Sequence, residues 1–313
     1  MAIVNKQNSD PVPDPVSGQL SSNPSMLVVV GVAIASMLLW GGTPAATRYA
    51  IGGFDPVMAA VMRIAVAATI SLLIVIIARL SAPSGMRQWM LAAVSGICCF
   101  AIFPIVLGSG IARTSTGHAA LIIAMGPVVT GLIAAGLERT VPKKQWWAGT
   151  VIALIGVVLL IAEGGDGNVK AASLIGDLIC VAGMCIVAVG YIAGGRLSAE
   201  LNAFAVTCWG LIIAGFALLP ILLIRGPGFD WEIIGTSSWG GVVYLAIFSS
   251  ILGYAGFFWA LDKGGVMRIS PIQFIVPVAG VIYGYLLFDE VFTSVMLTST
   301  IFIIGGIAFA RRA

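Results

Sequence analysis

The chain has 313 residues, of which 59% are hydrophobic and only 9% are charged, and its formal net charge is +3. A chain with a mean hydropathy of +1.07 has too few polar residues to cover the surface of a water-soluble globule of this size. The composition therefore predicts an all-α integral membrane protein. The small, dispersed positive charge gives no basic stripe of the kind that binds nucleic acid, so we expect no nucleic-acid partner.

Residues 1–25 are polar and rich in proline, and no apolar core follows a basic start. They predict a disordered cytoplasmic tail rather than a cleaved signal peptide. Beyond this tail, a window of about 19 residues predicts ten membrane-spanning helices. The predicted spans are 26–47, 55–79, 89–111, 115–137, 145–162, 174–196, 202–224, 239–261, 270–288 and 292–310.

Basic residues are concentrated on one of the two alternating sets of loops. Eleven Lys and Arg residues lie in the tail, in every second loop and at the C-terminus, and four lie on the other set. The excess of positive charge on one side predicts that both ends of the chain are cytoplasmic. The eleven are Lys6, Arg79, Arg87, Arg139, Lys143, Lys144, Arg196, Lys263, Arg268, Arg311 and Arg312, and the four are Arg48, Arg113, Lys170 and Arg225.

The second half of the chain repeats the first in weaker form, at an offset of about 150 residues. The recurring residues are Arg48 and Arg196, Arg113 and Lys263, Pro127 and Pro277, and Glu138 and Glu290. Because each half holds an odd number of spans, the halves must cross the membrane in opposite directions, as in transporters with inverted repeats. We therefore expect two inverted five-helix repeats, 26–162 and 174–313, joined by a linker at 163–173 and enclosing a central cavity.

Several motifs in fixed order are similar to those of one family. The first half holds LLWGGTPAATRYA, FDPVMAAVMRIAVAA and GIARTSTGHAALIIAMGPVVTGLIAAGLE, and the second holds GDLICVAGMC, FIVPVAGVIYGYLLFDE and TSTIFIIGGIAFA. Over about residues 26–310 the chain resembles the EamA-type exporters of the drug/metabolite transporter superfamily. The resemblance implies ten helices around a cavity lined by helices 1, 3, 4, 6, 8 and 9. It also implies export of amino acids, other metabolites or drugs, while related families carry sugar phosphates or nucleotide sugars.

Aromatic and polar side chains on the expected cavity helices are candidates for substrate binding. They would suit an amphipathic solute with an apolar body and a few hydrogen-bonding atoms, although aromatic residues at helical spacing are also typical of core packing. These candidates are Trp40, Thr43, Tyr191, Tyr254, Phe258, Gln273 and Phe274.

His118 is the only histidine and starts the fourth predicted span, and Arg268 occupies the matching place in the second half. Two such groups, related by the repeat, would bind an anionic group of the substrate alternately from the two sides. A local capping role for His118 and an orientation role for Arg268 stay open. A proton-linked cycle through His118 would give a transport rate that changes steeply between about pH 5.5 and 7.5.

Four residues are structural or gating candidates. Pro44, Pro127 and Pro277 are predicted inside spans, where each would free the carbonyl four residues earlier for a substrate or for a neighbouring hydroxyl. Arg63 lies deep in a span, at an insertion cost of about 3 kcal/mol, and should find carboxylate or carbonyl partners within the bundle. We favour a structural tie for Arg63, with substrate contact as the alternative. Two GxxxG spacings, Gly190/Gly194 and Gly280/Gly284, predict close helix contacts.

The missing motifs narrow the function. The chain has no GxxxxGK[ST] nucleotide loop, no GxSxG nucleophile turn and no CxxC pair, so we expect no enzyme, no ATP-driven pump, no cofactor and no metal site. Carboxylates fall at span ends, which favours facilitated diffusion or exchange over a buried acid relay. The sequence thus predicts a bacterial inner-membrane exporter of small molecules, most of all amino acids including aromatic ones. A sugar-phosphate, nucleotide-sugar or multidrug transporter is the alternative, and both a monomer and a homodimer fit.

Overall fold

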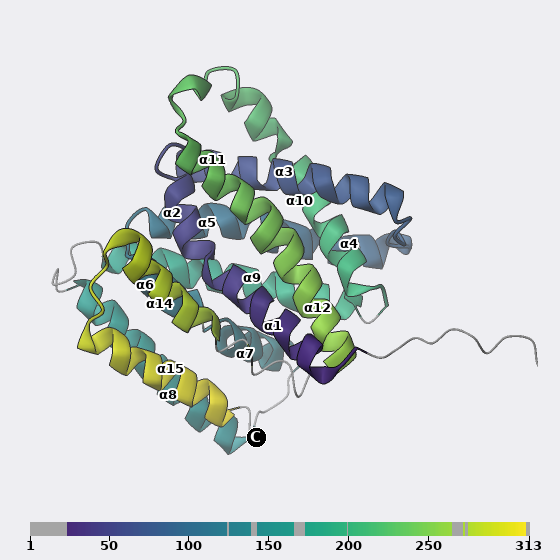
Figure 1. Ribbon diagram of the computed structural model, residues 1–313. Helices are drawn as coiled ribbons and strands as arrows, with labels where there is room; N and C mark the ends of the chain where they lie inside the picture. Colours follow the sequence, from purple (N-terminus) through teal and green to yellow (C-terminus); the bar gives the residue numbers. More distant parts are fainter. Residues whose placement is uncertain are drawn as a thin grey trace, which may run out of the picture.

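The computed structural model describes residues 24–123, 125–138, 143–165, 173–198, 200–264, 272 and 275–310. All regular structure in these ranges is helical (Figure 1). The α-helices are α1 (Met26–Gly41), α2 (Thr43–Ala50), α3 (Pro56–Ile77), α4 (Gly85–Gly96), α5 (Phe103–Ile111), α6 (Thr116–Ile123), α7 (Gly126–Glu138), α8 (Lys144–Gly165), α9 (Leu174–Ser198), α10 (Ala203–Arg225), α11 (Thr236–Val243), α12 (Gly253–Gly264), α14 (Ile275–Phe288) and α15 (Ser294–Ala310). Two π-helical segments, η1 (Ile97–Ile102) and η3 (Tyr244–Leu252), and one 3₁₀ turn, η2 (Trp231–Ile233), complete them.

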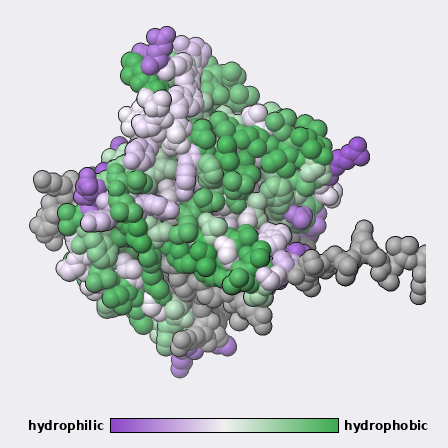
Figure 2. Space-filling view, in the orientation of Figure 1, coloured by the Kyte–Doolittle hydropathy of each residue, from purple (hydrophilic) through white to green (hydrophobic). Residues whose placement is uncertain are grey.

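The surface of the helix bundle is apolar enough to lie in lipid. Within the described residues, six helical segments are long and hydrophobic enough to cross a bilayer, and shorter apolar helices accompany them. Leu27, Ile77 and Ile224 are 84%, 80% and 79% exposed, which would be costly in water and is favourable against acyl chains. Hydrophobic residues cover most of the face in Figure 2, with hydrophilic residues chiefly at its margins. The prediction of an all-helical membrane protein is confirmed.

Helices from distant parts of the chain pack in pairs. α15 lies along α8, and α10 lies along α3 (Figure 1). The α4–η1–α5 helix packs on α9, while α1 packs between α12 and α14. The two π-helical segments lie in the middle of long helices that continue as α-helix on either side. A π turn shifts the facing of the following side chains and occurs often at functional sites.

The expectation that three prolines interrupt helix interiors is wrong. α1 ends at Gly41 and α2 begins at Thr43, so Pro44 lies in the first turn of α2. Pro127 and Pro277 likewise lie in the first turns of α7 and α14. A first-turn proline removes no helical hydrogen bond, because the N–H at that position has no partner within its helix. At the junction of α1 and α2, the backbone N–H of Gly42 donates to the carbonyl oxygen of Leu38 at 3.2 Å.

Span boundaries differ from prediction mainly where one predicted helix is divided into two. The predicted helix at 26–47 is α1 and α2, which are separated at Gly42. The predicted helix at 115–137 is two helices, α6 and α7, that meet near Met125. The other described spans begin and end within a few residues of their predicted limits.

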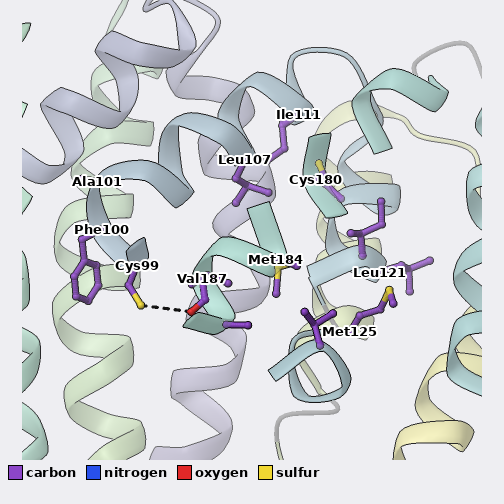
Figure 3. Close-up of a cluster of buried hydrophobic side chains, with 14 of the residues drawn as sticks. Cys99, Phe100, Ala101, Leu107, Ile111, Leu121, Met125, Cys180, Met184 and Val187 are labelled. Carbon is purple, nitrogen blue, oxygen red and sulfur yellow. Dashed lines mark hydrogen bonds between the residues drawn. The ribbon is translucent and has the colours of Figure 1, made fainter. Parts of the chain in front are cut away.

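The largest buried apolar cluster joins η1 and α5 to α9 and α6. Figure 3 shows Cys99 and Phe100 beside Val187, with Met184 farther along α9. The Cys99 thiol lies 3.8 Å from the carbonyl oxygen of Val187 and donates to it. The glycines of the predicted GxxxG spacings make close contacts of the expected kind: Gly190 lies against Cys99, and Gly280 lies against Ala120.

Candidate functional site

Trp40 and Thr43, both predicted substrate residues, meet the π-helical segment η3 inside the bundle. The indole Nε1 of Trp40 donates to the carbonyl oxygen of Ser249 at 3.0 Å. The hydroxyl of Thr43 lies 2.8 Å from the hydroxyl of Ser249. Residue 43 is one turn beyond residue 40 along the chain, so both side chains contact the same serine and join α1 and α2 to η3.

Arg63 crosses from α3 to the same π-helical segment. Its Nε and Nη2 atoms donate to the hydroxyl oxygen of Ser250 at 3.1 and 3.0 Å, and the residue is only 7% exposed. Ser250 in turn donates its own hydrogen to the carbonyl oxygen of Leu245 at 2.8 Å. Among the described residues, the group that accepts the hydrogen bonds of Arg63 is a hydroxyl and not the expected carboxylate or carbonyl.

Aromatic rings surround these polar groups. Tyr254 packs edge-on against Trp40, with ring centroids 4.8 Å apart, and against Phe100 at 5.7 Å. The hydroxyls of Tyr191 and Tyr254 lie 3.5 Å apart, which places α9 opposite α12. Tyr191 is 40% exposed, although its hydroxyl faces another helix.

We refer to these side chains as the central cluster. Its members come from α1, α2, α3, η1, α9, η3 and α12, and are Trp40, Thr43, Arg63, Phe100, Tyr191, Ser249, Ser250 and Tyr254. Sequence reasoning selected five of them and missed Phe100, Ser249 and Ser250. The adjacent serines inside an otherwise apolar span were a usable signal, because a hydroxyl pair in a membrane helix needs partners.

Four other predicted substrate residues have side chains that the structure does not describe. Phe258 belongs to α12, but its side chain is not described. Arg268, Gln273 and Phe274 fall outside the described residues, as does the side chain of Pro127.

His118 makes a separate contact between α6 and α9. Its Nδ1 lies 2.9 Å from the carboxylate of Asp177, and both side chains are completely buried. Thr114 donates its hydroxyl hydrogen to the other oxygen of the same carboxylate. Because Asp177 is held from two sides, this group ties the start of α6 to the first turn of α9.

A second polar group closes one end of the bundle. Arg48, at the end of α2, forms an ion pair with Glu290 at 2.8 Å and donates to the hydroxyl of Thr116 at 3.2 Å. The two carboxylate oxygens of Glu290 also accept the backbone N–H groups of Thr116 and Gly117, at 2.7 and 2.9 Å. A carboxylate at a helix N-terminus is stabilised by the free N–H groups and by the helix dipole. We call this set of four residues the Arg48–Glu290 lock.

Two more ion pairs join loops at the periphery. Arg225 pairs with Asp55 at 3.0 Å, between the end of α10 and the start of α3. Arg87 pairs with Glu200, and hydrogen bonds from Arg87 and then Gln88 hold the pKa of the Glu200 carboxyl below its usual value. Within the described part of the chain, no group of three or more His, Cys, Asp or Glu residues could hold a metal ion.

Comparison with known proteins identifies the family. The sequence profile of the EamA-like transporter family matches residues 27–162 and matches again at residues 174–312. The chain belongs to the EamA-like transporter family. This EamA-family protein is therefore a multi-pass membrane transporter, as its sequence resemblance implied.

Its relatives cover nearly the whole chain. It is 26% identical over 282 residues to the uncharacterized transporter YdeK of Bacillus subtilis (strain 168), covering 88% of this chain and 94% of that one. It is also 26% identical over 274 residues to protein PecM of Dickeya dadantii (strain 3937), covering 87% and 89%. One solved crystal structure superimposes with a TM-score of 0.62 at 18% identity, over 91% of this chain and 98% of that chain, which shows a shared fold.

Proposed function

We propose that this EamA-family protein is a secondary transporter that exports small metabolites, most of all amino acids including aromatic ones. Two inverted five-helix repeats would enclose one path and open it alternately to either side of a bacterial inner membrane, with both chain ends in the cytoplasm. The substrate would bind at the central cluster. The observation that carries the proposal is the convergence of helices from both halves of a family-matched transporter on one polar and aromatic site.

The helix contacts support the two-repeat arrangement. The fifth span of each half, α8 and α15, pack together, as do the second spans, α3 and α10. The third span of each half carries a π-helical segment, and Cys99 of η1 is 150 positions before Ser249 of η3. Cys99 contacts the first span of the second half, and Ser249 contacts the first span of the first half. Such reciprocal contacts are expected of two halves related by a two-fold axis.

Contacts between loops support the alternating topology. The Arg48–Glu290 lock and the Arg225–Asp55 pair each join loops that the ten-span topology assigns to the non-cytoplasmic side. Arg87 and Glu200 belong to two loops assigned to the cytoplasmic side. The Lys and Arg excess makes that second side the inner one.

The Arg48–Glu290 lock supports alternating access. It connects α2, α6 and the segment after α14, so it holds the bundle closed at the non-cytoplasmic end. In the sequence repeat, Arg48 corresponds to Arg196 and Glu290 to Glu138. We infer that the repeat supplies a matching pair for closing the opposite end when this lock is broken.

The chemistry of the central cluster favours amino acids over phosphorylated sugars. Trp40, Tyr254 and Phe100 offer apolar ring surface, and one guanidinium lies among them. Recognition of a doubly charged phosphate group usually requires several cationic groups that converge on it. Among the described residues, Arg63 is the one buried Lys or Arg side chain.

Uptake by proteoliposomes containing the purified protein tests the proposal. We expect labelled phenylalanine or tryptophan to exchange across the membrane without ATP, and glucose 6-phosphate not to exchange. Empty liposomes serve as the control. Exchange of the sugar phosphate with no exchange of any amino acid would reverse the assignment.

A further inference from the structure

Among the described residues, no acidic side chain forms an ion pair with Arg63. Its hydrogen bonds within the described residues go only to the hydroxyl of Ser250. The described ion pairs are Arg48–Glu290, Arg87–Glu200, His118–Asp177 and Arg225–Asp55, and none involves Arg63. A guanidinium that is 7% exposed within a membrane bundle is costly unless an anion accompanies it during part of the working cycle.

The guanidinium retains donors for such an anion. Nε and Nη2 both donate to the hydroxyl oxygen of Ser250. Nη1 makes no hydrogen bond with the described residues. A planar guanidinium edge with free N–H groups matches the two oxygens of a carboxylate.

Ser250 fixes the direction of this edge. Its hydroxyl hydrogen is used by the carbonyl of Leu245, five residues earlier in the π-helical segment, so its oxygen can only accept from Arg63. Two hydrogen bonds to one oxygen then hold the Nε–Nη2 side of Arg63 against η3. Among the described residues, the Nη1 side of the guanidinium is left for a further acceptor.

We propose that Arg63 binds the carboxylate of the transported solute, and that Trp40 and Tyr254 contact its apolar body. This assignment rests on the proposed transport function and narrows it to carboxylates of single negative charge that carry an aromatic or large apolar group. The solute's carboxylate supplies the missing counter-charge. A phosphate monoester would keep an unneutralised negative charge in the same low-dielectric site.

Ligand fragments test the carboxylate requirement on the unmodified protein. 3-Phenylpropionate keeps the ring and the carboxylate of phenylalanine, and phenethylamine keeps the ring and the amine. We expect 3-phenylpropionate to raise the melting temperature of the purified protein in detergent and to compete with labelled phenylalanine for binding. Phenethylamine should compete at least about tenfold more weakly, because it lacks the charge-assisted hydrogen bonds to Arg63. Equal competition by the two fragments, or stronger competition by the amine, would overturn the assignment.

Substitution of Arg63 tests the residue itself. In Arg63→Gln, affinity for 3-phenylpropionate should fall by about tenfold or more, while affinity for phenylalaninamide, which lacks the carboxylate, should change little. Arg225→Gln is the matched control, because it removes a guanidinium from an exposed pair and should leave both affinities unchanged. Equal losses for the acid and the amide in Arg63→Gln would show a structural role only. If Arg63→Gln does not fold, the fragment comparison on the unmodified protein still decides.

The outcome for Arg63 is separate from the outcome for transport. Preferential binding of 3-phenylpropionate without transport of any amino acid would support the carboxylate site and reject the proposed substrates. Transport of phenylalanine with equal competition by both fragments would support the proposed function and reject the role of Arg63.

Discussion

Asp177 and Arg63 are both buried charged residues, but they differ in the partners that the protein gives them. Asp177 has its partners within the protein, since His118 and Thr114 both contact its carboxylate. Among the described residues, Arg63 has only a hydroxyl acceptor, which is the arrangement expected when the counter-charge arrives with a ligand. The sequence indicated a structural role or a substrate contact for Arg63 and assigned no role to Asp177. The distinction depends on side chains more than 50 positions away, beyond the reach of local patterns.

The buried carboxylate of Asp177 is expected to stabilise the fold rather than bind substrate. Asp177→Ala leaves the hydrogen-bonding groups of His118 and Thr114 without this acceptor, and should lower the free energy of unfolding by about 3 kcal/mol. Thermal unfolding in detergent measures this loss. Glu232→Ala, at an exposed position, should change stability by less than about 0.5 kcal/mol. Similar melting temperatures for the two variants would contradict the account.

The Arg48–Glu290 lock leads to a prediction about access. Glu290→Gln removes the ion pair and weakens the cap on α6, so the non-cytoplasmic end should open more often. A cysteine introduced at Ala45, which lines a groove between α2, α11 and α14, reports this opening. With Glu290→Gln, its reaction with a membrane-impermeant maleimide added outside should be about tenfold faster, as loss of charge-assisted hydrogen bonds implies.

The control for this measurement lies at the same end of the molecule. Arg225→Gln breaks the peripheral pair with Asp55 and should leave the labelling rate at Ala45→Cys unchanged. An equal increase in both variants would mean that general loosening, rather than the lock, controls access. The parent protein without the new cysteine gives the background from its five native cysteines.

At the level of elements, the sequence predicted what depends on average hydropathy and missed what depends on local backbone geometry. The spans of α3, α9 and α10 were predicted to within a few residues, because an apolar run of this length is typical of a membrane-spanning helix. The π-helical segments η1 and η3 carry no such signal, since a π turn is set by packing on neighbouring helices. The break between α6 and α7 was missed for a related reason: a window average passes over a short break near Met125, and Pro127 was assigned to a helix interior.

Close helix contacts can be tested within one helix. A Cβ added at Gly190 would lie 3.0 Å from Cβ of Cys98 and 3.1 Å from the backbone nitrogen of Cys99, whereas one added at Gly195 meets nothing within 4 Å. Gly190→Ala should therefore destabilise the protein by about 1–3 kcal/mol through overpacking. Gly195→Ala should be neutral or stabilise it by up to about 1 kcal/mol, because alanine favours the helix. Melting temperatures in the opposite order would contradict the packing of α9 on η1.

At the level of the whole molecule, the proposed alternating access depends on a two-fold pseudo-symmetry between the two halves of the chain. The family profile matches the chain twice, the related spans pack in pairs, and the helices of both halves meet at the central cluster. The duplication was readable from the sequence because proline and charged residues recur at a nearly constant offset in apolar surroundings. The residues of the central cluster could be predicted only in part from the sequence. The contact of Arg63 with Ser250 depends on how α3 crosses η3, which the sequence does not indicate.

The sidedness of three points on the chain tests the inverted repeat most directly. Epitope tags are placed at each chain end and within the linker 163–173, and antibody access is compared in intact and permeabilised cells. We predict that both end tags are reached only after permeabilisation and that the linker tag is reached in intact cells. End tags on opposite sides of the membrane, or a linker tag on the same side as both ends, would contradict two five-span halves of opposite orientation.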